Sequence, residues 1–534
     1  MRAFMKRESC KFSVVLALLV LLSGWMDDAW GQAQAQQRIE KPRRGGHLIF
    51  ATSKTMTTPH PFIGSRSVSA SIKQAMYQSL TAYDENGDLQ GVLASEWNSK
   101  QGNAVWVFNL RQGVKFHNGK EMSADDVVWS VKYIMDADNG AGGYGVLSRA
   151  VKEVKSLGKY GVEFSLKSSD ALFPQSIEGL EPITVIPANS LPPKTLKVGS
   201  EPPPGTGPFK FEGWKAGQDL TVARFDEYWG GRPYLDRITF KLIAQEAGRF
   251  NALRAGDIHI AERLSPIRAQ QVKNGSVAGI HVNTAGVSGG RVLAFNFTSP
   301  QFKNPLIRQA FALSLDRAAI INQATLGVGT PRVINVPPGS VFDKGLPQET
   351  KRDVARAREL LKKAGYNRAA IVMLGRRGHE DWLEPIQRMA SEAGFNVKLL
   401  IVESNIYSER EQQGAFDVVL ENVSGANEPG VSYISEFGCI PERGARGANV
   451  GLYCNPDFDR LGQQYLKESD VNKRAAYLRQ MVKILIDDVA LYTIGFANDR
   501  WFGWSDKVVG FRNNEQSYFH PKGDGGLDRT WLKE

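Results

Sequence analysis

Alternating apolar residues predict a β-strand immediately before residue 111. Trp106, Phe108 and Leu110 recur at every second position, and this period places their side chains on one face of a strand. Val114 and Phe116 repeat the spacing a few residues later, so we expect a second short strand there. All five residues therefore have a folding role.

A turn and a capped helix are predicted after these two strands. Asn118-Gly119 is a dipeptide typical of turns that need a positive φ. Ser123 and Asp126 have the spacing of a reciprocal helix cap. Apolar residues then recur at helical spacing, namely Val127, Val128, Val131, Ile134 and Met135. We expect residues 110–130 to be scaffold rather than a binding site.

Strand and helix patterns alternate along much of the remaining chain. Strands are predicted at residues 47–51, 238–243, 292–297, 397–402 and 416–421. Helices are predicted at residues 247–255, 353–364 and 382–393 and after the cap Asn304-Pro305. A rigid Pro/Gly-rich stretch at residues 202–208 is interpreted as a joint between subdomains. This alternation indicates an α/β architecture in which helices cover the sheets.

The N-terminus has the pattern of an export signal. Lys6, Arg7 and Lys11 precede an apolar run at residues 12–22, and small residues stand before Gln32. We expect cleavage before Gln32, which makes residues 1–31 a signal peptide, and Ala33-Gln34-Ala35 is a second candidate cleavage site. A membrane anchor is the alternative, but the apolar run is shorter than the roughly 18 residues that span a bilayer.

A lipid anchor is not expected. The segment before Trp25 resembles the box that precedes a lipid-modified cysteine, but Trp25 occupies the position of that cysteine. Of three cysteines, Cys10 leaves with the signal peptide. Cys439 and Cys454 remain, and an even pair in an oxidising compartment predicts a disulfide. A metal site is the alternative, but no histidine lies near the two cysteines in the sequence.

Composition is that of an ordinary folded protein. Of the 534 residues, 42% are hydrophobic and 23% are charged, which excludes bulk disorder and allows two or more domains. The formal net charge is +10, but the densest basic cluster is Lys41, Arg43 and Arg44. Three charges are too few for a nucleic-acid or membrane patch, so no nucleic acid is expected as a partner.

Several segments, taken in order, resemble one protein family. They are LRQGVKFHNGKEMSADDVVWS at 110–130, GTGPFKFEGW at 205–214, EYWGGRPYLDRI at 227–238, FNALRAGDIHI at 250–260, NPLIRQAFALSLDRAAI at 304–320 and ARELLKKAGY at 357–366. Together they resemble the extracellular solute-binding proteins of the peptide, opine and nickel class of ABC importers, solute-binding protein family 5. The match covers nearly all of the exported chain.

The resemblance implies a two-lobe α/β fold, a type II periplasmic binding protein of the large peptide-binding class. The implied domains are lobe I at 45–295, with an inserted subdomain at about 80–205, lobe II at 296–492, and a C-terminal return to lobe I at 493–534. Hinge strands are expected near residues 292–297 and 491–496. Closure over the ligand, without covalent chemistry, would exclude water and strengthen each polar contact.

The resemblance also implies a ligand region in lobe II. Peptide-binding members lay the ligand backbone against the equivalent of residues 421–429, where the candidates are Glu421, Asn422, Ser424, Gly425 and Asn427. Those members usually hold the amino group with an aspartate, and the matching position here is Gly425 or Ala426. A buried ammonium without a paired charge is costly. Either Glu421 or Glu428 replaces that aspartate, or the ligand lacks a free amine.

Two further regions are implied to reach the ligand. Arg376 and Arg377 lie where dipeptide-binding members place an arginine that grips a carboxylate, and a guanidinium fork suits that role. Residues 55–62 correspond to a first-lobe loop at the cleft, where Thr57 and His60 are candidates. His60 stands beside prolines and is more often a turn histidine. The spacing of Cys439 and Cys454 also resembles a disulfide of dipeptide-binding members.

Enzyme and metal alternatives have weak support. Residues 286–290 match the nucleophile-elbow pattern around Ser288, but a strand pattern follows the serine instead of the helix that the motif requires. The seven histidines are scattered, and no two have the i, i+4 spacing of a helical metal site. No cofactor is implied, and a secreted hydrolase using Ser288 is the alternative from another class.

The sequence predicts a monomeric periplasmic receptor for a small peptide-like or amino-acid-derived solute. Its partners would be that ligand and the permease and ATPase of an ABC importer at the inner membrane. An opine, an oligosaccharide or chelated nickel is the alternative ligand within the same fold.

Overall fold

The computed structural model describes most of the chain after residue 40. The described residues are 41–54, 58–62, 72–84, 88–178, 183–192, 201–284, 290–327, 329–336, 339–346, 351–423, 428–439, 449–497, 501–512 and 526–533. The helices and strands of the described residues lie in the unit Arg44–Glu534.

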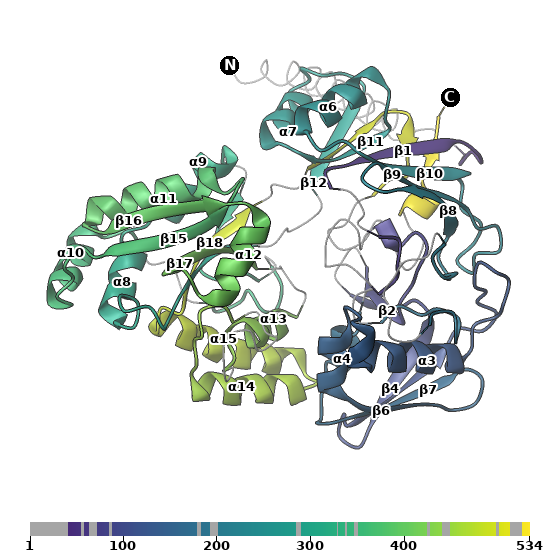
Figure 1. Cartoon of the computed structure of the whole chain (residues 1–534), viewed down its shortest axis with the longest axis horizontal. Coiled ribbons are helices and arrows are strands. Elements are labelled where there is room, and N and C mark those ends of the chain that lie inside the picture. The colour runs from purple at the N-terminus through teal and green to yellow at the C-terminus, as the bar shows by residue number, and fades with distance from the viewer. Residues whose placement is uncertain are drawn as a thin grey trace, which may run out of the picture. The chain divides into compact units, whose positions relative to one another are not determined.

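A seven-stranded mixed sheet contains strands from both ends of the described chain (Figure 1). Its order is β12-β19-β11-β1-β10-β9-β8. The strands are β1 (His47–Thr52), β8 (Phe209–Lys215), β9 (Asp219–Arg224), β10 (Arg237–Leu242), β11 (Ile260–Leu264), β12 (Ile280–Thr284) and β19 (Trp501–Ser505). The late strand β19 lies between β11 and β12, so a segment near the C-terminus completes the sheet that the N-terminal strand began.

Two helices pack against one end of this sheet. They are α6 (Glu246–Ala255) and α7 (Pro266–Lys273), and their apolar residues share a core with Ala51, Ile258 and Trp501. The predicted end of α6 is confirmed, because Gly256 has a φ of 81°, a left-handed value that favours glycine.

Between β1 and β8 the chain forms a separate four-stranded antiparallel sheet. Its order is β4-β5-β7-β6, with β4 (Ala94–Lys100), β5 (Val105–Leu110), β6 (Val151–Ser156) and β7 (Gly161–Leu166). Around it lie β2 (Thr81–Tyr83), β3 (Leu89–Gly91), α3 (Ala124–Met135), α4 (Tyr144–Ala150) and α5 (Phe173–Ser176). These elements belong to the region predicted as an inserted subdomain.

The pattern at residues 106–130 is confirmed in part. The first strand forms as β5, but the second does not, and only an isolated bridge between Lys115 and Glu121 stands there. Backbone hydrogen bonds from Phe116 N–H to the Lys120 carbonyl at 2.9 Å and from Met122 N–H to the Val114 carbonyl at 2.8 Å flank that bridge. The predicted cap is present, since the Asp126 carboxylate accepts from the backbone N–H of Ser123 at 2.9 Å.

Asp126 also connects three parts of this subdomain. Its side chain is fully buried, and it accepts from the Lys120 ammonium at 2.6 Å and from the Ala188 N–H at 2.8 Å. The pKa of Asp126 is accordingly lowered, because these hydrogen bonds outweigh its burial. The segment has the structural role that its sequence predicted.

A second, six-stranded sheet is formed in the second half of the chain. Its order is β14-β18-β13-β17-β15-β16, with β13 (Gly290–Phe295), β14 (Gly329–Pro331), β15 (Ala370–Arg376), β16 (Asn396–Val402), β17 (Val418–Val423) and β18 (Leu491–Ala497). β15 pairs in parallel with both β16 and β17. The three therefore end at one edge of the sheet.

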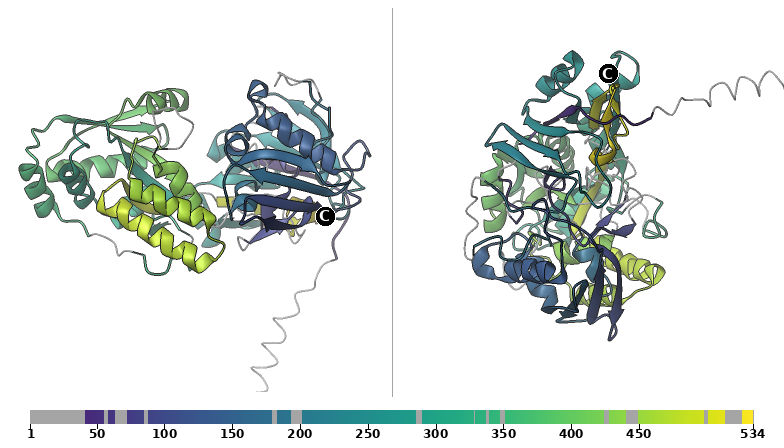
Figure 2. Two further views of the ribbon diagram at one scale, coloured as in Figure 1. Left: turned by 90° about the horizontal axis from the view of Figure 1, so that it is seen from below. Right: turned by 90° about the vertical axis from the view of Figure 1, so that its right-hand side faces the viewer.

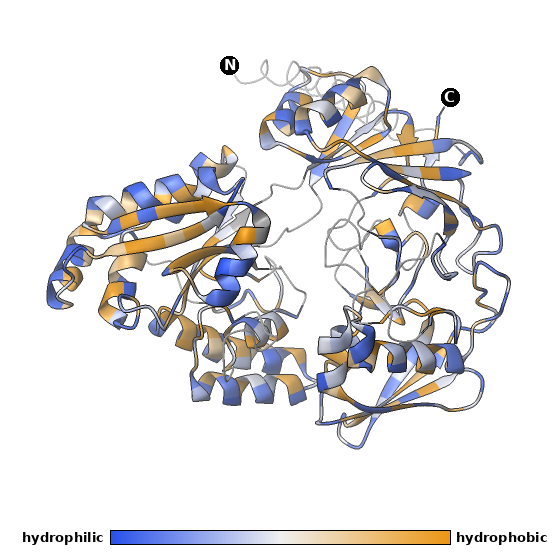
Figure 3. Ribbon diagram, viewed as in Figure 1, coloured by the Kyte–Doolittle hydropathy of each residue, from blue (hydrophilic) through white to orange (hydrophobic). Residues whose placement is uncertain are grey.

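Helices cover both faces of the six-stranded sheet. α8 (Pro305–Leu313), α9 (Arg317–Thr325), α10 (Val354–Lys363) and α11 (Glu380–Ala393) share a core with Leu293, whereas Ala294 packs with Tyr407 of α12 (Ser404–Gln413). Successive strand residues point to opposite faces. Figure 3 shows mostly hydrophobic strands and covering helices with mixed faces.

Three further helices form a layer beside this sheet. They are α13 (Pro429–Phe437), α14 (Pro456–Lys467) and α15 (Val471–Asp487), and α14 and α15 lie side by side in the views of Figures 1 and 2. Tyr433, Phe458, Tyr465 and Leu478 are in their shared core. Leu172 of the inserted region belongs to the same core and is 1% exposed.

The chain passes between the two large sheets twice. β12 of the first sheet precedes β13 of the second, and β18 of the second precedes β19 of the first. β13 and β18 pair with each other, so both passages connect to neighbouring strands of the second sheet. These strands include residues 292–295 and 491–496 of the predicted hinge, while the proposed hinge motion and lobe boundaries stay predictions.

Candidate functional site

The carboxyl ends of the parallel strands bring the candidate residues of the second sheet together. β15 ends at Arg376 and β17 at Val423, and Val423 pairs with Gly290 at the start of β13. The passages between the sheets thus leave from this same edge. In open α/β sheets, ligands bind outside the carboxyl ends of the strands.

Arg376 is half-buried at this edge and is held by two aromatic neighbours. Its Nε–H donates to Nε2 of His379 at 2.9 Å. Its guanidinium lies 5.5 Å from the centre of the Tyr407 ring, within the range of a cation–π contact. No described residue accepts a hydrogen bond from its two terminal amino groups.

Arg377 has a different environment. Its side chain is 74% exposed and forms an ion pair with Glu403, which is itself 61% exposed. Water screens such a pair, so its contribution to stability is small. Adjacent arginines of the sequence thus occupy a half-buried site and the open surface.

Glu421 is the acidic counterpart of Arg376 at the same edge. The Tyr407 hydroxyl donates to its carboxylate, so the tyrosine contacts the arginine with its ring and the glutamate with its hydroxyl. Burial, followed by the charge of Glu421, raises the pKa of the nearby Glu411 carboxyl. Burial and the same charge also raise the pKa of the Tyr407 hydroxyl.

A small cavity of about 60 Å³ lies beside Glu421. Its apolar wall includes Val292, Phe295 and Phe437, and Glu436 of α13 is a second carboxylate on it. Burial, with a smaller effect from Glu421, raises the pKa of Glu436 to about 8. Sequence reasoning missed Glu436; the signal was that Glu436 is the only charged residue of α13.

Glu428 is neutralised within the protein. It pairs with Arg474 at 2.6 Å, with side chains 12% and 7% exposed, and accepts from the Tyr465 hydroxyl at 2.6 Å. Of the two acids considered as replacements for the missing aspartate, Glu421 lines a cavity and Glu428 is committed to a buried ion pair.

Some predicted residues lie outside the described part of the chain. They are Thr57, Ser424, Gly425 and Asn427, together with Ser288 of the hydrolase alternative. Asn422 is described by its backbone, which pairs with Arg291 of β13. His60 is 2% exposed, and its Nδ1 accepts from the Phe62 N–H at 3.1 Å, a local contact typical of a turn histidine.

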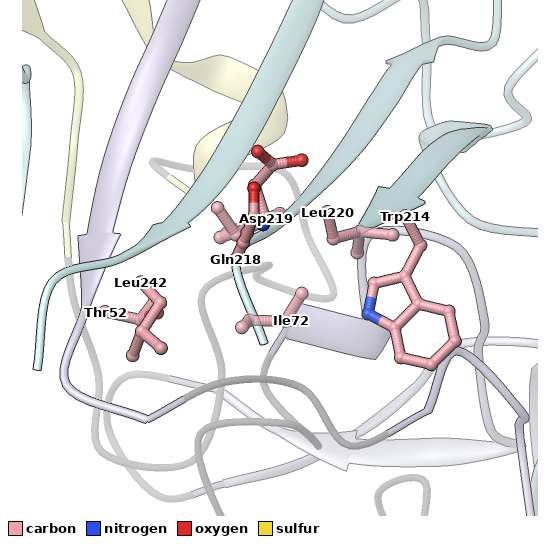
Figure 4. Close-up of a pocket in the computed structure, with 8 residues that line it drawn as sticks. Thr52, Ile72, Trp214, Gln218, Asp219, Leu220 and Leu242 are labelled. Atoms are coloured by element: carbon pink, nitrogen blue, oxygen red, sulfur yellow. The ribbon is translucent and has the colours of Figure 1, made fainter. Parts of the chain in front are cut away.

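A second cavity lies against the seven-stranded sheet. It measures about 10 Å³, and Figure 4 shows Trp214 at one end and Thr52 with Leu242 at the other. No predicted ligand residue lines it. We therefore place the candidate site at the second sheet.

The two remaining cysteines lie next to the end of α13. The sulfur atoms of Cys439 and Cys454 are 2.10 Å apart, and the Cys439 N–H donates to the Asp459 carboxylate at 3.1 Å. In the described part of the chain, no three His, Cys, Asp or Glu side chains are grouped to hold a metal. Among the same residues, no helix is both long and apolar enough to cross a membrane.

The chain matches a known family over most of its length. A model of the bacterial extracellular solute-binding proteins, family 5, matches residues 88–439. The oligopeptide-binding protein AppA of Bacillus subtilis is 26% identical, over 97% of this chain and 98% of that protein. The alignment therefore spans both proteins almost completely.

Solved structures share the fold. AppA of Bacillus subtilis in complex with a nonapeptide has a TM-score of 0.77 and 24% identity, covering 92% of this chain and 100% of that one. NikZ of Campylobacter jejuni in complex with Ni(L-His) has a TM-score of 0.78 and 19% identity, covering 91% and 99%. One fold thus serves very different ligands.

Proposed function

Because the chain belongs to the bacterial extracellular solute-binding proteins of family 5, we propose that it captures a small peptide-like or amino-acid-derived solute for an ABC importer. The observation that carries this proposal is the placement of Arg376 and Glu421 at one strand edge, joined by Tyr407. Opposite charges there suit a solute that carries both a cationic and an anionic group.

Binding requires closure and no chemistry. A site that closes removes water from the contacts of Arg376 and Glu421, and a lower local dielectric strengthens both. Movement about β13 and β18 is the proposed hinge. Family 5 proteins bind solutes and are not enzymes, so the hydrolase alternative at Ser288 is set aside.

Glu421 is the proposed partner of a cationic group. Glu428 already neutralises Arg474, and removing it from that pair would leave a buried charge uncompensated. Glu421 lines the cavity together with Glu436. The remaining proposed contacts are Thr57, Asn422, Ser424, Gly425 and Asn427, with Arg376 favoured over the exposed Arg377.

The charges of Arg376 and Glu421 also favour some of the alternative ligands over others. An uncharged oligosaccharide would leave Arg376 without an acceptor, which is costly for a half-buried cation. An opine carries carboxylates and a basic nitrogen and remains compatible with the site. The Ni(L-His) complex is a ligand of NikZ, and chelated nickel remains an alternative here.

We propose that the chain acts in the periplasm after export. Cleavage before Gln32 would release residues 1–31 without a lipid anchor, and oxidation there would form the Cys439–Cys454 disulfide. The mature receptor would be a monomer that docks on a permease and ATPase complex at the inner membrane. N-terminal sequencing and intact mass of the exported protein test the cleavage, the lipid and the disulfide together.

A solute panel tests the receptor function. Mature protein is heated with dipeptides, opines, oligosaccharides or chelated nickel, and the solute that raises Tm is recovered and checked by mass spectrometry. We expect a charged solute, recovered intact, whose affinity falls in Glu421→Gln and is retained in Glu359→Gln, an exposed control on α10. Chemical conversion of the solute, or no binder in the panel, would contradict the proposal.

A further inference from the structure

Arg376 differs from the buried arginines of the same sheet and helix layer in what its amino groups contact. Arg308 donates to the backbone carbonyls of Asp488, Phe302 and Lys303. Arg474 donates to Glu428 and to two carbonyls. Arg376 uses its Nε–H on His379, and its terminal amino groups have no acceptor among the described residues. Such a half-buried cation requires an acceptor from outside the chain.

The contact with Arg376 determines the tautomer of His379. A guanidinium has five N–H donors and no acceptor, so Nε2 of His379 must carry the lone pair and Nδ1 must carry the proton. Nδ1 has no hydrogen-bond partner in the described part of the chain, and the side chain is only 5% exposed. The imidazole therefore contributes one occupied acceptor and one buried donor without a partner.

We propose that His379 is a positioning residue that orients the Arg376 guanidinium so that its two terminal amino groups receive an anionic group of the solute. This inference rests on the proposed solute-binding function and extends it to the residue that aims the arginine. With Nε fixed by His379, the free amino groups form the fork that binds a carboxylate or phosphate with two parallel hydrogen bonds.

His379 keeps this acceptor over the physiological pH range. Burial, followed by the charges of Arg376 and Arg291, lowers the pKa of its imidazole to about 3. A protonated ring would lose the lone pair and repel the guanidinium. The neutral ring also lies 6.3 Å from the Tyr407 ring in an edge-on contact, so histidine and tyrosine restrict the arginine from two directions.

The surrounding acids leave Arg376 available. Glu421 accepts a hydrogen bond from the Tyr407 hydroxyl, and the raised pKa of Glu411 favours its uncharged form. Neither forms an ion pair with Arg376 among the described contacts. A solute anion would therefore not need to displace a carboxylate of the protein.

Acetate, a bare carboxylate, tests this inference in the ligand-free mature protein. The Nε–H NMR signal of Arg376, assigned by its loss in Arg376→Lys, is followed during an acetate titration. We expect saturable chemical-shift changes in the wild type. The affinity for acetate should be at least about tenfold lower in His379→Leu, because this variant loses one hydrogen bond to a charged group. His379→Gln, whose amide oxygen accepts, should recover affinity to within about threefold.

Controls separate positioning from folding. His281→Gln changes an exposed histidine of β12 and should bind acetate like the wild type. Nitrogen chemical shifts of His379 should report an unprotonated Nε2 down to pH 5. Acetate affinity unchanged in His379→Leu, or a proton on Nε2, would overturn the inference.

The same measurements distinguish this inference from the receptor function. A wild-type protein that binds a panel solute but shows no acetate effect at Arg376 overturns the anion subsite and leaves the receptor function standing. An acetate effect that His379→Leu abolishes supports the anion subsite. If no panel solute binds in the same protein, that failure counts against the receptor function and leaves the subsite standing.

Discussion

Glu428 and Arg474 form a buried ion pair with an N–O distance of 2.6 Å, although 46 residues separate them in the sequence. The arginine also donates to the carbonyls of Glu468 and Ser469, and Tyr465 donates to the glutamate. This network fixes the start of α13 against α14 and α15. It sits immediately after the segment proposed to hold the solute.

Breaking this pair should destabilise the protein strongly. Glu428→Gln leaves the Arg474 charge buried without compensation, and we expect a loss of about 3–5 kcal/mol in the free energy of unfolding. Urea denaturation measures this loss. The control is Glu359→Gln, which removes the partner of Arg356 in a pair that is 51% and 64% exposed, and it should change stability little. Equal effects in the two variants would contradict the assigned role of Glu428.

The cavity glutamate Glu436 should make stability depend on pH. Its pKa in the folded protein is about 8, above the ordinary 4.5, so between these values the folded state holds a proton that the unfolded chain has released. The free energy of unfolding should therefore fall as pH rises from about 5 to 8, by up to about 1.4 kcal/mol per pH unit for this group.

Glu436→Gln should remove the contribution of that group. Urea denaturation at several pH values would then give a shallower decline for Glu436→Gln than for the wild type, with Glu359→Gln following the wild type. A slope that does not change in Glu436→Gln would place the proton on another group.

The disulfide between Cys439 and Cys454 should stabilise the folded protein. Cys439 and Cys454 close a loop with a sequence separation of 15, and a loop of that size is worth about 3 kcal/mol in the chain-entropy model. The double variant Cys439→Ser with Cys454→Ser should unfold at a lower temperature than the oxidised wild type. Reductant should lower the Tm of the wild type and leave the double variant unchanged; identical Tm values for oxidised and reduced wild type would refute the contribution.

Leu172 should couple the inserted region to the helix layer. Its side chain is 1% exposed in the core of α13–α15, and the neighbouring Ala171 N–H donates to the Leu466 carbonyl at 2.8 Å. Leu172→Ala should cost about 2–5 kcal/mol of unfolding free energy. Leu157→Ala, at a residue that is 42% exposed, is the matched control, and a similar cost there would contradict the specific coupling.

The elements with strong local signals were predictable from sequence. Helix α8 begins at Asn304-Pro305 and α11 ends at Gly394, as predicted, because caps depend on residues within one turn. The strand expected at Val114 and Phe116 was wrong, since two alternating residues do not decide whether a partner strand is within reach.

The environments of the site residues were not predictable in the same way. Arg376 and Arg377 are adjacent and chemically identical, yet one packs on Tyr407 and the other faces solvent with Glu403. Glu421 and Glu428 were equal candidates in the sequence, and their partners come from α12 and α15. A strand end, two helices and a parallel sheet had to be assembled before these pairs existed.

The sequence by itself determined the family, the α/β alternation and several element boundaries, because those follow from periodicity, caps and ordered motifs over short spans of chain. Only the tertiary structure decided which charged side chains are paired within the protein and which can still bind a solute. A carboxylate is neutralised, or a guanidinium left without an acceptor, by groups brought within a few ångströms from distant parts of the chain, and that proximity is set by packing rather than by spacing in the sequence.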